Sequence, residues 1–261
     1  MPSVVVTGSS RGLGFAMAQE FLARGYQVTI SGRNADTLAA AQTKLATSGD
    51  RLHAVLCDVR ERAQVEQLWH AATARFGSVD IWINNAGINQ PDLNLWNIPP
   101  AAVHAVVETN LLGTIYGSQV AVQGMLHQRT GRVFNMEGFG SNDMQQAGLN
   151  LYGTTKRALT HFTSALAKET ADTPVKVGLL SPGMMVTDFI TKAESVINDP
   201  ERSRKVFNIL GDKPETVAAF LVAKIHAGTH NGEKIAWLTK RKAALRFMTA
   251  AFRKRDLFSE H

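Results

Sequence analysis

Short apolar runs alternate with longer segments of helical periodicity along almost the whole chain. A short run that is apolar on both sides suits a strand that helices cover on both faces. Strand–helix–strand order of this kind predicts a parallel sheet with right-handed crossovers. The expected strands are residues 3–7, 26–31, 51–57, 79–84, 131–136, 175–181 and 234–238. The expected helices are residues 12–24, 34–47, 61–76, 99–128, 151–171 and 213–227.

A glycine-rich stretch follows the first expected strand and opens the first expected helix. Residues 7–14 read TGSSRGLG. Gly8 permits a tight turn, and Gly12 and Gly14 let the backbone approach a pyrophosphate at the positively polarised helix N terminus. The pattern predicts a single-domain Rossmann fold of the α/β class, with a doubly wound, mostly parallel sheet and helices on both faces. The expected contacts from this turn are Gly8, Ser9, Ser10, Arg11, Gly12, Leu13 and Gly14.

The end of the second expected strand indicates which dinucleotide binds. NAD sites usually place Asp or Glu there, where the carboxylate binds the ribose 2′-hydroxyl. Here the strand ends ISGR, without an acidic residue, and Arg33 takes the last position. Arg33 and Arg11 can together pair with a 2′-phosphate, which favours NADP(H) as the cofactor. Two solvated surface arginines are the alternative.

Two further strand ends supply candidate contacts to the adenosine half of the cofactor. Asp58 and Val59 follow the third expected strand, where Asp58 can accept from the adenine amino group. Small residues follow the fourth strand and let the adenosine half pack closely. These are Asn85, Ala86 and Gly87.

A tyrosine and a lysine stand four residues apart in the segment YGTTK, residues 152–156. On a helix this spacing puts both side chains on one face. A phenol normally titrates near pH ~10, and a neighbouring ammonium lowers its pKa and suits it to acid catalysis. Lys156 can also hold the nicotinamide ribose hydroxyls. We interpret Tyr152 and Lys156 as a catalytic pair and as part of the cofactor site.

These motifs together resemble the short-chain dehydrogenase/reductase family. TGSSRGLG, NNAG, Asn110, YGTTK and SPG occur in the family's order, and the resemblance covers residues 3 to about 238. It implies an NADPH-dependent oxidoreductase that acts on a carbonyl or alcohol group. It also implies that Asn110 orders a water linking Lys156 to solvent. The residues that it places around the nicotinamide are Pro182, Gly183, Met184 and Thr187.

One position departs from the family pattern. A serine usually follows the fifth strand and donates a hydrogen bond to the substrate carbonyl beside the tyrosine. Here the segment reads FNMEGFGS, and the expected position falls on Gly138 or Phe139. Losing one such donor costs about 2–4 kcal/mol of transition-state stabilisation unless another group replaces it. Ser141 is one candidate replacement, and Glu137 is a second side chain that can point at the site.

The same segment resembles FNMDGAGS of the chlorophyll b reductases, a branch of this family. LSPGM, TD and the tail IAWLT agree with that branch. The resemblance implies reduction of the C7 formyl group of chlorophyll(ide) b to hydroxymethyl, with Tyr152 donating a proton to the formyl oxygen. A bulky pigment requires a wide apolar entrance. The candidates for it are Phe139, Met144, Leu149, Met184, Met185, Phe189 and Ile190.

Basic residues are concentrated near the C terminus. The net charge is +6, and the stretch 240–255 carries seven basic residues and no acidic one. The rest of the chain is therefore almost neutral, which argues against general nucleic-acid binding. A helix over 240–256 would align Leu245, Met248 and Phe252 on one stripe. We favour a docked terminal helix with solvated charges, and contact with an anionic membrane or a neighbouring subunit is the alternative.

These assignments divide the chain into two parts. Residues 1–239 form an NADP-binding Rossmann-type catalytic domain, and residues 240–261 form a basic C-terminal extension. Residues 184–212 follow a strand's carboxyl end and are interpreted as a substrate lid, with a plain surface insertion as the alternative. By family resemblance, residues 99–128 and 151–171 are candidate faces of a homo-oligomer.

Three further expectations concern location, metals and alternative functions. A strand-like segment begins almost at Met1, and no apolar run approaches the ~20 residues of a membrane span, so we expect no signal, transit or transmembrane segment and a cytoplasmic protein of bacterial origin. His226 and His230 have the spacing of a zinc pair but lack a third ligand nearby, so no metal is expected. A general reductase of smaller ketones and aldehydes remains an alternative. So does a regulatory NADP(H)-binding protein, although a proton relay is superfluous in a pure binder.

Overall fold

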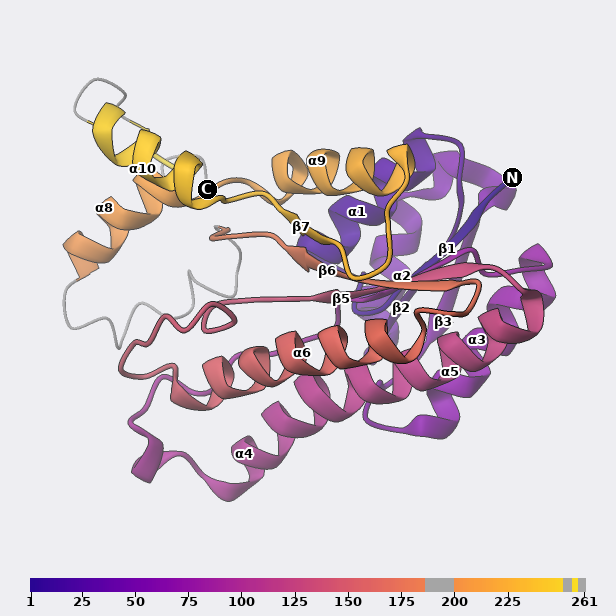
Figure 1. Cartoon of the computed structure of the whole chain (residues 1–261), viewed down its shortest axis with the longest axis horizontal. Helices are drawn as coiled ribbons and strands as arrows, with labels where there is room; N and C mark the ends of the chain where they lie inside the picture. The colour runs from indigo at the N-terminus through magenta and orange to yellow at the C-terminus, as the bar shows by residue number, and fades with distance from the viewer. Residues whose placement is uncertain (186–199, 251–254, 258–261) are drawn as a thin grey trace.

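The computed structural model describes residues 1–185, 200–250 and 255–257. Its seven-stranded sheet has the order β3-β2-β1-β4-β5-β6-β7, and every neighbouring pair is parallel (Figure 1). The order reverses between β1 and β4, which confirms the expected doubly wound topology. The strands are β1 Ser3–Val6, β2 Gln27–Gly32, β3 Leu52–Leu56, β4 Ile81–Asn84, β5 Gly131–Met136, β6 Val175–Ser181 and β7 Lys234–Ala236.

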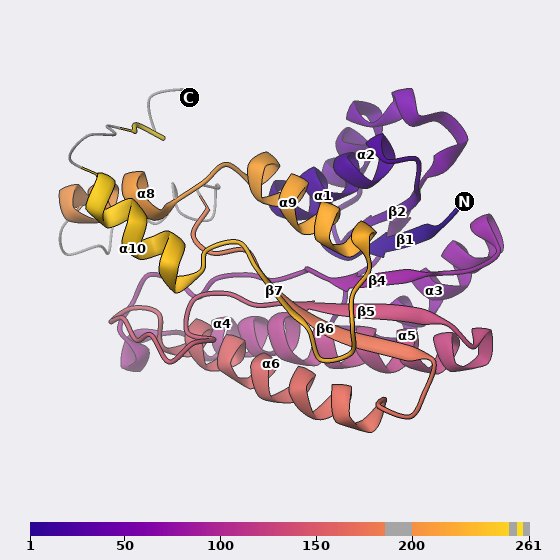
Figure 2. The same cartoon turned by 45° about the horizontal axis from the view of Figure 1, so that its top comes forward.

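Helices cover both faces of this sheet (Figure 2). Helices α1, α2 and α9 lie on one face, and α3, α4, α5 and α6 lie on the other. The α-helices are α1 Gly12–Ala23, α2 Ala35–Lys44, α3 Arg62–Phe76, α4 Pro100–Val107, α5 Gly113–Gln128, α6 Asn150–Glu169, α8 Pro200–Leu210, α9 Pro214–Ala227 and α10 Lys240–Thr249. Two 3₁₀ turns, Ala46–Arg51 and Leu95–Asn97, and a π turn, Glu108–Leu112, complete the described helical elements.

The strands contribute apolar side chains to two buried clusters, one on each side of the sheet. Val4 and Val6 of β1 face the cluster beneath α1 and α9, whereas Val5 faces the cluster beneath α3 and α5. All three valines are at most 1% exposed. Burial on both faces explains why this strand shows no polar alternation in the sequence.

The expected helix 99–128 is interrupted. A π turn, Glu108–Leu112, separates α4 from α5 and carries Asn110. Such turns insert one extra residue into a helix and are frequent at functional sites. Because the periodicity of apolar residues continues across the turn, the sequence pattern did not indicate it.

The interval 184–212 is more regular than expected. Residues 200–210 form α8. A β-bridge joins Met185 to Asp212, and the Asp212 N–H donates to the Met184 carbonyl at 3.1 Å. The two ends of the interval are thereby held together. The central part of the predicted lid, with Thr187, Phe189 and Ile190, lies outside the described residues.

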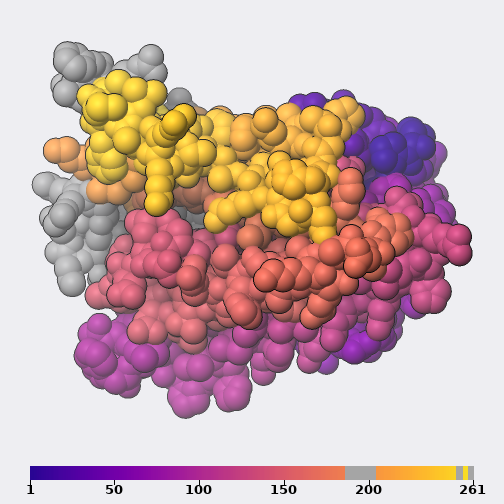
Figure 3. Space-filling view, in the orientation of Figure 1, coloured from indigo at the N-terminus to yellow at the C-terminus, as the bar shows by residue number. Residues whose placement is uncertain are grey.

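The C-terminal helix forms as expected but packs differently. Helix α10 lies against α8 at one end of the molecule, where Figure 3 shows it at the surface. The side chains of Leu245 and Met248, which the helical spacing aligns on one stripe, are 57% and 70% exposed and do not dock on the domain. Arg246 faces the domain instead and pairs with Asp212 at 2.7 Å. Phe252 lies outside the described residues.

Within the described parts of the chain, no helix combines the length and the apolar character needed to cross a membrane.

Candidate active site

The predicted site residues come together at the carboxyl ends of β1, β4, β5 and β6. This is the edge where the strand order reverses, and ligands of doubly wound sheets bind there. The glycine-rich turn, the loop after β4, the loop after β5 and the start of α6 meet at this edge.

The glycine-rich turn fits a pyrophosphate. Gly8 and Gly12 have φ values of +61° and +59°, a backbone region that favours glycine. A Cβ atom on Gly8 would lie 2.7 Å from the Ala86 Cα, and one on Gly14 would lie 2.6 Å from the Gly8 carbonyl oxygen. A Cβ on Gly12 would meet nothing within 4 Å, and no described side chain caps α1. The turn is thus packed on one side and open at a helix N terminus whose N–H groups can receive an anion.

Three predicted cofactor contacts support the turn from within. The Ser9 hydroxyl donates to the Val6 carbonyl at 2.7 Å and accepts from the Ser31 N–H at 2.9 Å. Because Ser9 is fully buried, its assignment as a direct contact is corrected to a supporting role. Leu13 belongs to the hydrophobic core. Asn85 donates to the carbonyls of Thr7 and Gly8 at 2.9 and 3.0 Å and ties the turn to β4.

Three arginines follow the first three strands. Arg11 and Arg33 are exposed at the ends of β1 and β2, as a 2′-phosphate site requires. Arg60 is the third, and sequence reasoning missed it. Its Nη2 donates to Asp58 Oδ2 at 2.6 Å, and this hydrogen bond is the main reason why the pKa of Asp58 lies below its usual value. The only sequence signal for Arg60 is its position two residues after Asp58.

Other predicted cofactor residues occupy the same rim. Ser10 lies beside Gly32, on which a Cβ would be 3.3 Å from the Ser10 Oγ. Val59 packs against Gly113, where a Cβ would lie 2.7 Å from the Val59 Cγ2. Gly183 has a φ of +73° and packs against Leu238, so the turn after β6 rests on the segment after β7. Within that turn Pro182 is buried and Met184 half-buried.

Tyr152 and Lys156 lie on the first two turns of α6. The Lys156 Nζ is 5.7 Å from the centroid of the Tyr152 ring and donates to the Met136 carbonyl at 3.2 Å. A Cβ on Gly87 would lie 3.5 Å from this Nζ, and Gly87 is exposed. Lys156, although 4% exposed, therefore borders an open side of the site, where a ribose can approach.

The charge states of the pair differ from the expected ones. Burial raises the pKa of the Tyr152 phenol above its usual value, and this outweighs the lowering that was expected from Lys156. Burial also lowers the pKa of Lys156 to about 8, and the Glu137 carboxylate opposes that change. At neutral pH the phenol keeps its proton and the lysine carries its charge. A protonated phenol beside a cation is suited to donate a proton, because the ammonium stabilises the phenolate that remains.

Asn110 joins three elements of the site. Its Oδ1 accepts from the Ile88 N–H at 2.8 Å, and its Nδ2 donates to the Ile88 carbonyl at 2.9 Å and to the Thr155 hydroxyl at 3.2 Å. These bonds link the loop after β4 to α6 through the π turn. The water-ordering role that the family resemblance implies for Asn110 stays a prediction.

Gln90 is a positioning residue that sequence reasoning missed. Its Oε1 accepts from the Tyr152 N–H at 2.9 Å. Gln90 is 5% exposed, so this bond anchors the start of α6 from inside the protein. No spacing or motif in the sequence signals the contact.

Gly138 makes room for Tyr152. A Cβ at this position would clash with the Tyr152 hydroxyl and would lie 3.1 Å from both the Tyr152 Cζ and the Lys156 Cγ. Gly138 is one of the two positions expected to hold the family's serine, and a side chain there would require Tyr152 to shift. The replacement of serine by glycine and the placement of Tyr152 are parts of one arrangement.

Glu137 does not act on the substrate directly. Its side chain is fully buried; its Oε1 accepts from the Thr160 hydroxyl at 3.0 Å, and its Oε2 pairs with the Lys234 Nζ at 2.5 Å. The assignment of Glu137 as a catalytic group is corrected to that of a positioning residue beside Lys156. Ser141 is 5% exposed, and its N–H donates to the Gly138 carbonyl at 3.2 Å.

The predicted entrance residues come from two loops. Phe139 and Leu149 are half-buried and Met144 is exposed in the loop between β5 and α6. Met185 is half-buried after β6. Phe189 lies outside the described residues.

The candidate zinc residues do not converge: His226 Nδ1 lies 2.9 Å from the Tyr26 hydroxyl, and His230 pairs with Glu233 at 3.3 Å.

The fold and this arrangement of side chains define a Rossmann-type oxidoreductase. The family model described as short chain dehydrogenase matches residues 2–197, and the chain belongs to this family. Members bind NAD(P)H, so the chain belongs to a family of NAD(P)H-dependent oxidoreductases.

Two named relatives indicate which members of the family the chain resembles. The chain is 36% identical to a probable chloroplastic chlorophyll(ide) b reductase of Oryza sativa subsp. japonica, over 99% of this chain and 54% of that protein. It is 34% identical to a chloroplastic chlorophyll(ide) b reductase of Arabidopsis thaliana, over 92% of this chain and 71% of that protein. The chain spans about half the length of the first of these relatives.

A solved structure agrees with both the fold and the cofactor. The crystal structure of an actinorhodin polyketide ketoreductase variant with NADPH is 25% identical and superposes with a TM-score of 0.78. The match covers 90% of this chain and 95% of that one. The predicted fold class is thereby confirmed. The relatives above confirm the resemblance to chlorophyll b reductases, and the family's binding of NAD(P)H agrees with the predicted cofactor.

The expected location is wrong. The chlorophyll(ide) b reductases that the chain resembles are chloroplastic proteins of plants, which contradicts the expectation of a bacterial cytoplasmic protein.

Proposed function

We propose that this chain reduces the C7 formyl group of chlorophyll(ide) b to hydroxymethyl with NADPH. The supporting observation is the seating of the Tyr152 hydroxyl over Gly138, within the segment that resembles the chlorophyll b reductases. In this proposal residues 1–239 are the catalytic domain and residues 240–261 are the basic extension. Because the chain belongs to a family of oxidoreductases, the alternative of a purely regulatory protein is set aside.

The chemistry assigns one task to each residue of the pair. The glycine-rich turn and Lys156 would hold NADPH, which would supply the hydride for the formyl carbon. Tyr152 gives its phenolic proton to the formyl oxygen, so that the C=O group becomes CH–OH. Lys156, close beside the ring, stabilises the phenolate by its charge and is placed to hold the ribose at the open edge by Gly87. The donor role of the missing serine falls to Tyr152 or to Ser141, which carries the only hydroxyl of the segment FNMEGFGS.

The substrate is tested by following NADPH oxidation with chlorophyllide b and with a panel of smaller aldehydes and ketones. We expect the highest kcat/KM for chlorophyllide b, with the 7-hydroxymethyl pigment as the product. The similarity to a polyketide ketoreductase keeps a general ketone reductase as the second candidate. If the protein reduces small ketones but not chlorophyllide b, it is a general ketone reductase and the proposed substrate is wrong.

The cofactor preference has its own prediction. Arg33→Ala is expected to weaken NADPH binding by about 10- to 100-fold, since a charge-assisted hydrogen bond contributes roughly 1.5–3 kcal/mol. NADH lacks the 2′-phosphate, so its affinity should stay unchanged. Fluorescence titration with both cofactors measures the difference. Arg24→Ala, which removes only an exposed pair with Glu20, is the matched control. Equal loss for NADPH and NADH contradicts the 2′-phosphate role.

The pH dependence follows from Lys156. Its pKa is lowered to about 8, so the ammonium is present below that pH and is lost as the pH rises through it. We expect kcat/KM, which reports the free enzyme, to fall above pH ~8. Glu137→Gln removes a carboxylate that raises this pKa, and the alkaline limb should move to lower pH. Glu66→Gln, in an exposed pair with Arg62, is the control. An alkaline limb that stays in place in Glu137→Gln excludes this coupling.

A further inference from the structure

Helix α10 turns a charged side toward the protein and large apolar side chains toward solvent. Arg246 faces inward, where its Nη1 and Nη2 donate to Asp212 Oδ2 and Oδ1 at 2.7 and 3.1 Å. Leu245, Phe247 and Met248 are 57%, 52% and 70% exposed. A terminal helix that merely docks on its own domain shows the reverse arrangement, with its apolar stripe buried.

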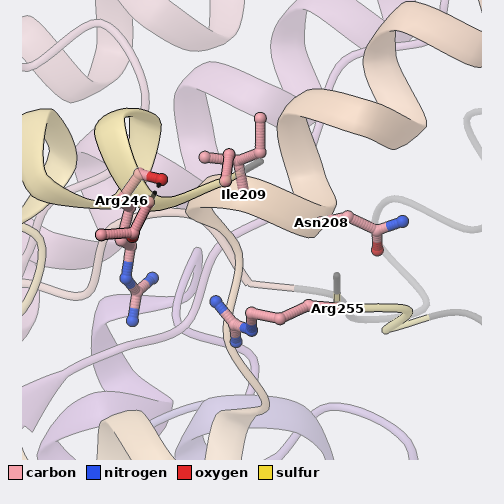
Figure 4. A pocket seen from close by; sticks show the side chains of 6 residues that line it. Asn208, Ile209, Arg246 and Arg255 are labelled. Carbon is pink, nitrogen blue, oxygen red and sulfur yellow. Dashed lines mark hydrogen bonds between the residues drawn. The ribbon is translucent and has the colours of Figure 1, made fainter. Parts of the chain in front are cut away.

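A buried carboxylate holds α10 in this orientation. Asp212 is 5% exposed and also accepts from the Trp237 Nε1 at 2.6 Å and the Arg255 Nη2 at 2.9 Å. Figure 4 shows Arg246 and Arg255 extending their guanidinium groups to the same side of the pocket between α8 and α10. Since charged, hydrogen-bonded groups face inward, directed bonds set the rotation of the helix, and its apolar residues are left outside.

The outward face of α10 is continuous. By helical spacing Phe247, Lys240, Met248, Arg241 and Leu245 follow one another around one side. Lys240 and Arg241 are exposed, and no acidic residue occurs in 240–255. An apolar face flanked by cations is the composition of a helix that lies in the surface of an anionic membrane.

A second apolar element lies at the same end of the molecule. Leu93, Leu95 and Trp96 are 40%, 49% and 81% exposed in the turn that leads into α4. Figures 1 and 2 show this turn, α10 and the start of α6 at the same end of the molecule. Tryptophan is favoured at the boundary between water and lipid, because its ring is apolar and its N–H is polar.

We propose that this end of the molecule docks on an anionic lipid surface, with the outward face of α10 and the turn 93–96 entering the interface. A second copy of the chain fits this face less well, because a symmetric contact would bring the cations Lys240 and Arg241 of both copies together without an acidic partner on the helix. This docking proposal does not depend on which carbonyl compound the protein reduces.

Co-sedimentation with vesicles tests the proposal. The full chain is expected to bind vesicles of phosphatidylglycerol and phosphatidylcholine, and to bind less to pure phosphatidylcholine or in high salt. Changing the three apolar residues Leu245, Phe247 and Met248 together to Gln should reduce the partition coefficient about tenfold or more. Lys240→Gln with Arg241→Gln should reduce it by roughly tenfold on the anionic vesicles only. Leu126→Gln, an exposed apolar residue at the end of α5, should bind like the wild type.

Each other outcome overturns the proposal. These outcomes are a wild-type chain that binds neither vesicle, a triple variant that binds like the wild type, and a wild-type dimer that the triple variant converts to a monomer without any lipid binding. If the triple variant lacks a thermal transition, Met248→Gln alone replaces it. NADPH oxidation with a water-soluble aldehyde, measured on the same variants, should stay at the wild-type level. Loss of lipid binding is thus distinguished from failure of the proposed reaction.

Discussion

Tyr152→Phe is expected to lower the turnover of the carbonyl substrate by about 10²- to 10⁴-fold while NADPH still binds. A positioned general acid contributes about this factor. Burial keeps the proton on the Tyr152 phenol, and the Phe ring fills the same volume without a transferable proton. The change therefore removes the proton donor and leaves the packing of α6 intact. Stopped-flow measurement of NADPH oxidation, together with fluorescence titration of NADPH, separates catalysis from binding.

Tyr116→Phe is the matched control for this prediction. Tyr116 is half-buried on α5 and packs against the core cluster on the far side of the sheet from α1. It should keep wild-type turnover. Undiminished turnover in Tyr152→Phe rules out the proposed proton donor, and a loss of NADPH affinity in the same variant points to a disturbed fold.

Gly138→Ser restores the residue type of the family, yet it is expected to lower kcat/KM by about 100-fold. A Cβ at this position clashes with the Tyr152 hydroxyl and lies 3.1 Å from the Lys156 Cγ. Tyr152 must move to accept the new side chain, and a displacement of ~1 Å in a catalytic group costs about 10²-fold in rate. Overpacking should also cost about 1–3 kcal/mol of unfolding free energy. Steady-state kinetics and thermal unfolding measure the two effects.

Gly153→Ala is the control for the glycine substitution. Gly153 follows Tyr152 directly on α6, and a Cβ there would lie 3.7 Å from the Gly140 Cα, an ordinary contact. Alanine also favours a helix more than glycine does. This variant should keep its activity and its stability. An increase in kcat/KM for Gly138→Ser would show that Tyr152 has room for a serine beside it.

Local features of the site could be predicted from the sequence. The turn TGSSRGLG and the pair Tyr152 and Lys156 depend on neighbouring residues, and short-range geometry determines where they project. The strand–helix alternation likewise determines a parallel sheet. The predicted sheet is confirmed, and the turn and the pair have the predicted local geometry, because each rests on contacts within one or two elements.

Long-range contacts could not be predicted in this way. In the sequence, Glu137 is a carboxylate without an evident partner. In the structure, Lys234 pairs with it from β7, which lies two strands away from β5 in the sheet. Gln90 anchors Tyr152 from a different loop. Such pairings depend on which surfaces the crossovers bring together, and no local pattern records this.

Periodicity and motif spacing were enough to indicate the class of fold and the local geometry of the glycine-rich turn and of Tyr152 and Lys156, because they act over short distances. The close approach of the Tyr152 hydroxyl to Gly138 depends on the packing of α6, which no local pattern contains. The tertiary structure also decided the orientation of α10. A helical wheel gives the angles between side chains, but the rotation of the helix depends on its partner, and here the buried Asp212 draws Arg246 inward and leaves the apolar residues outside.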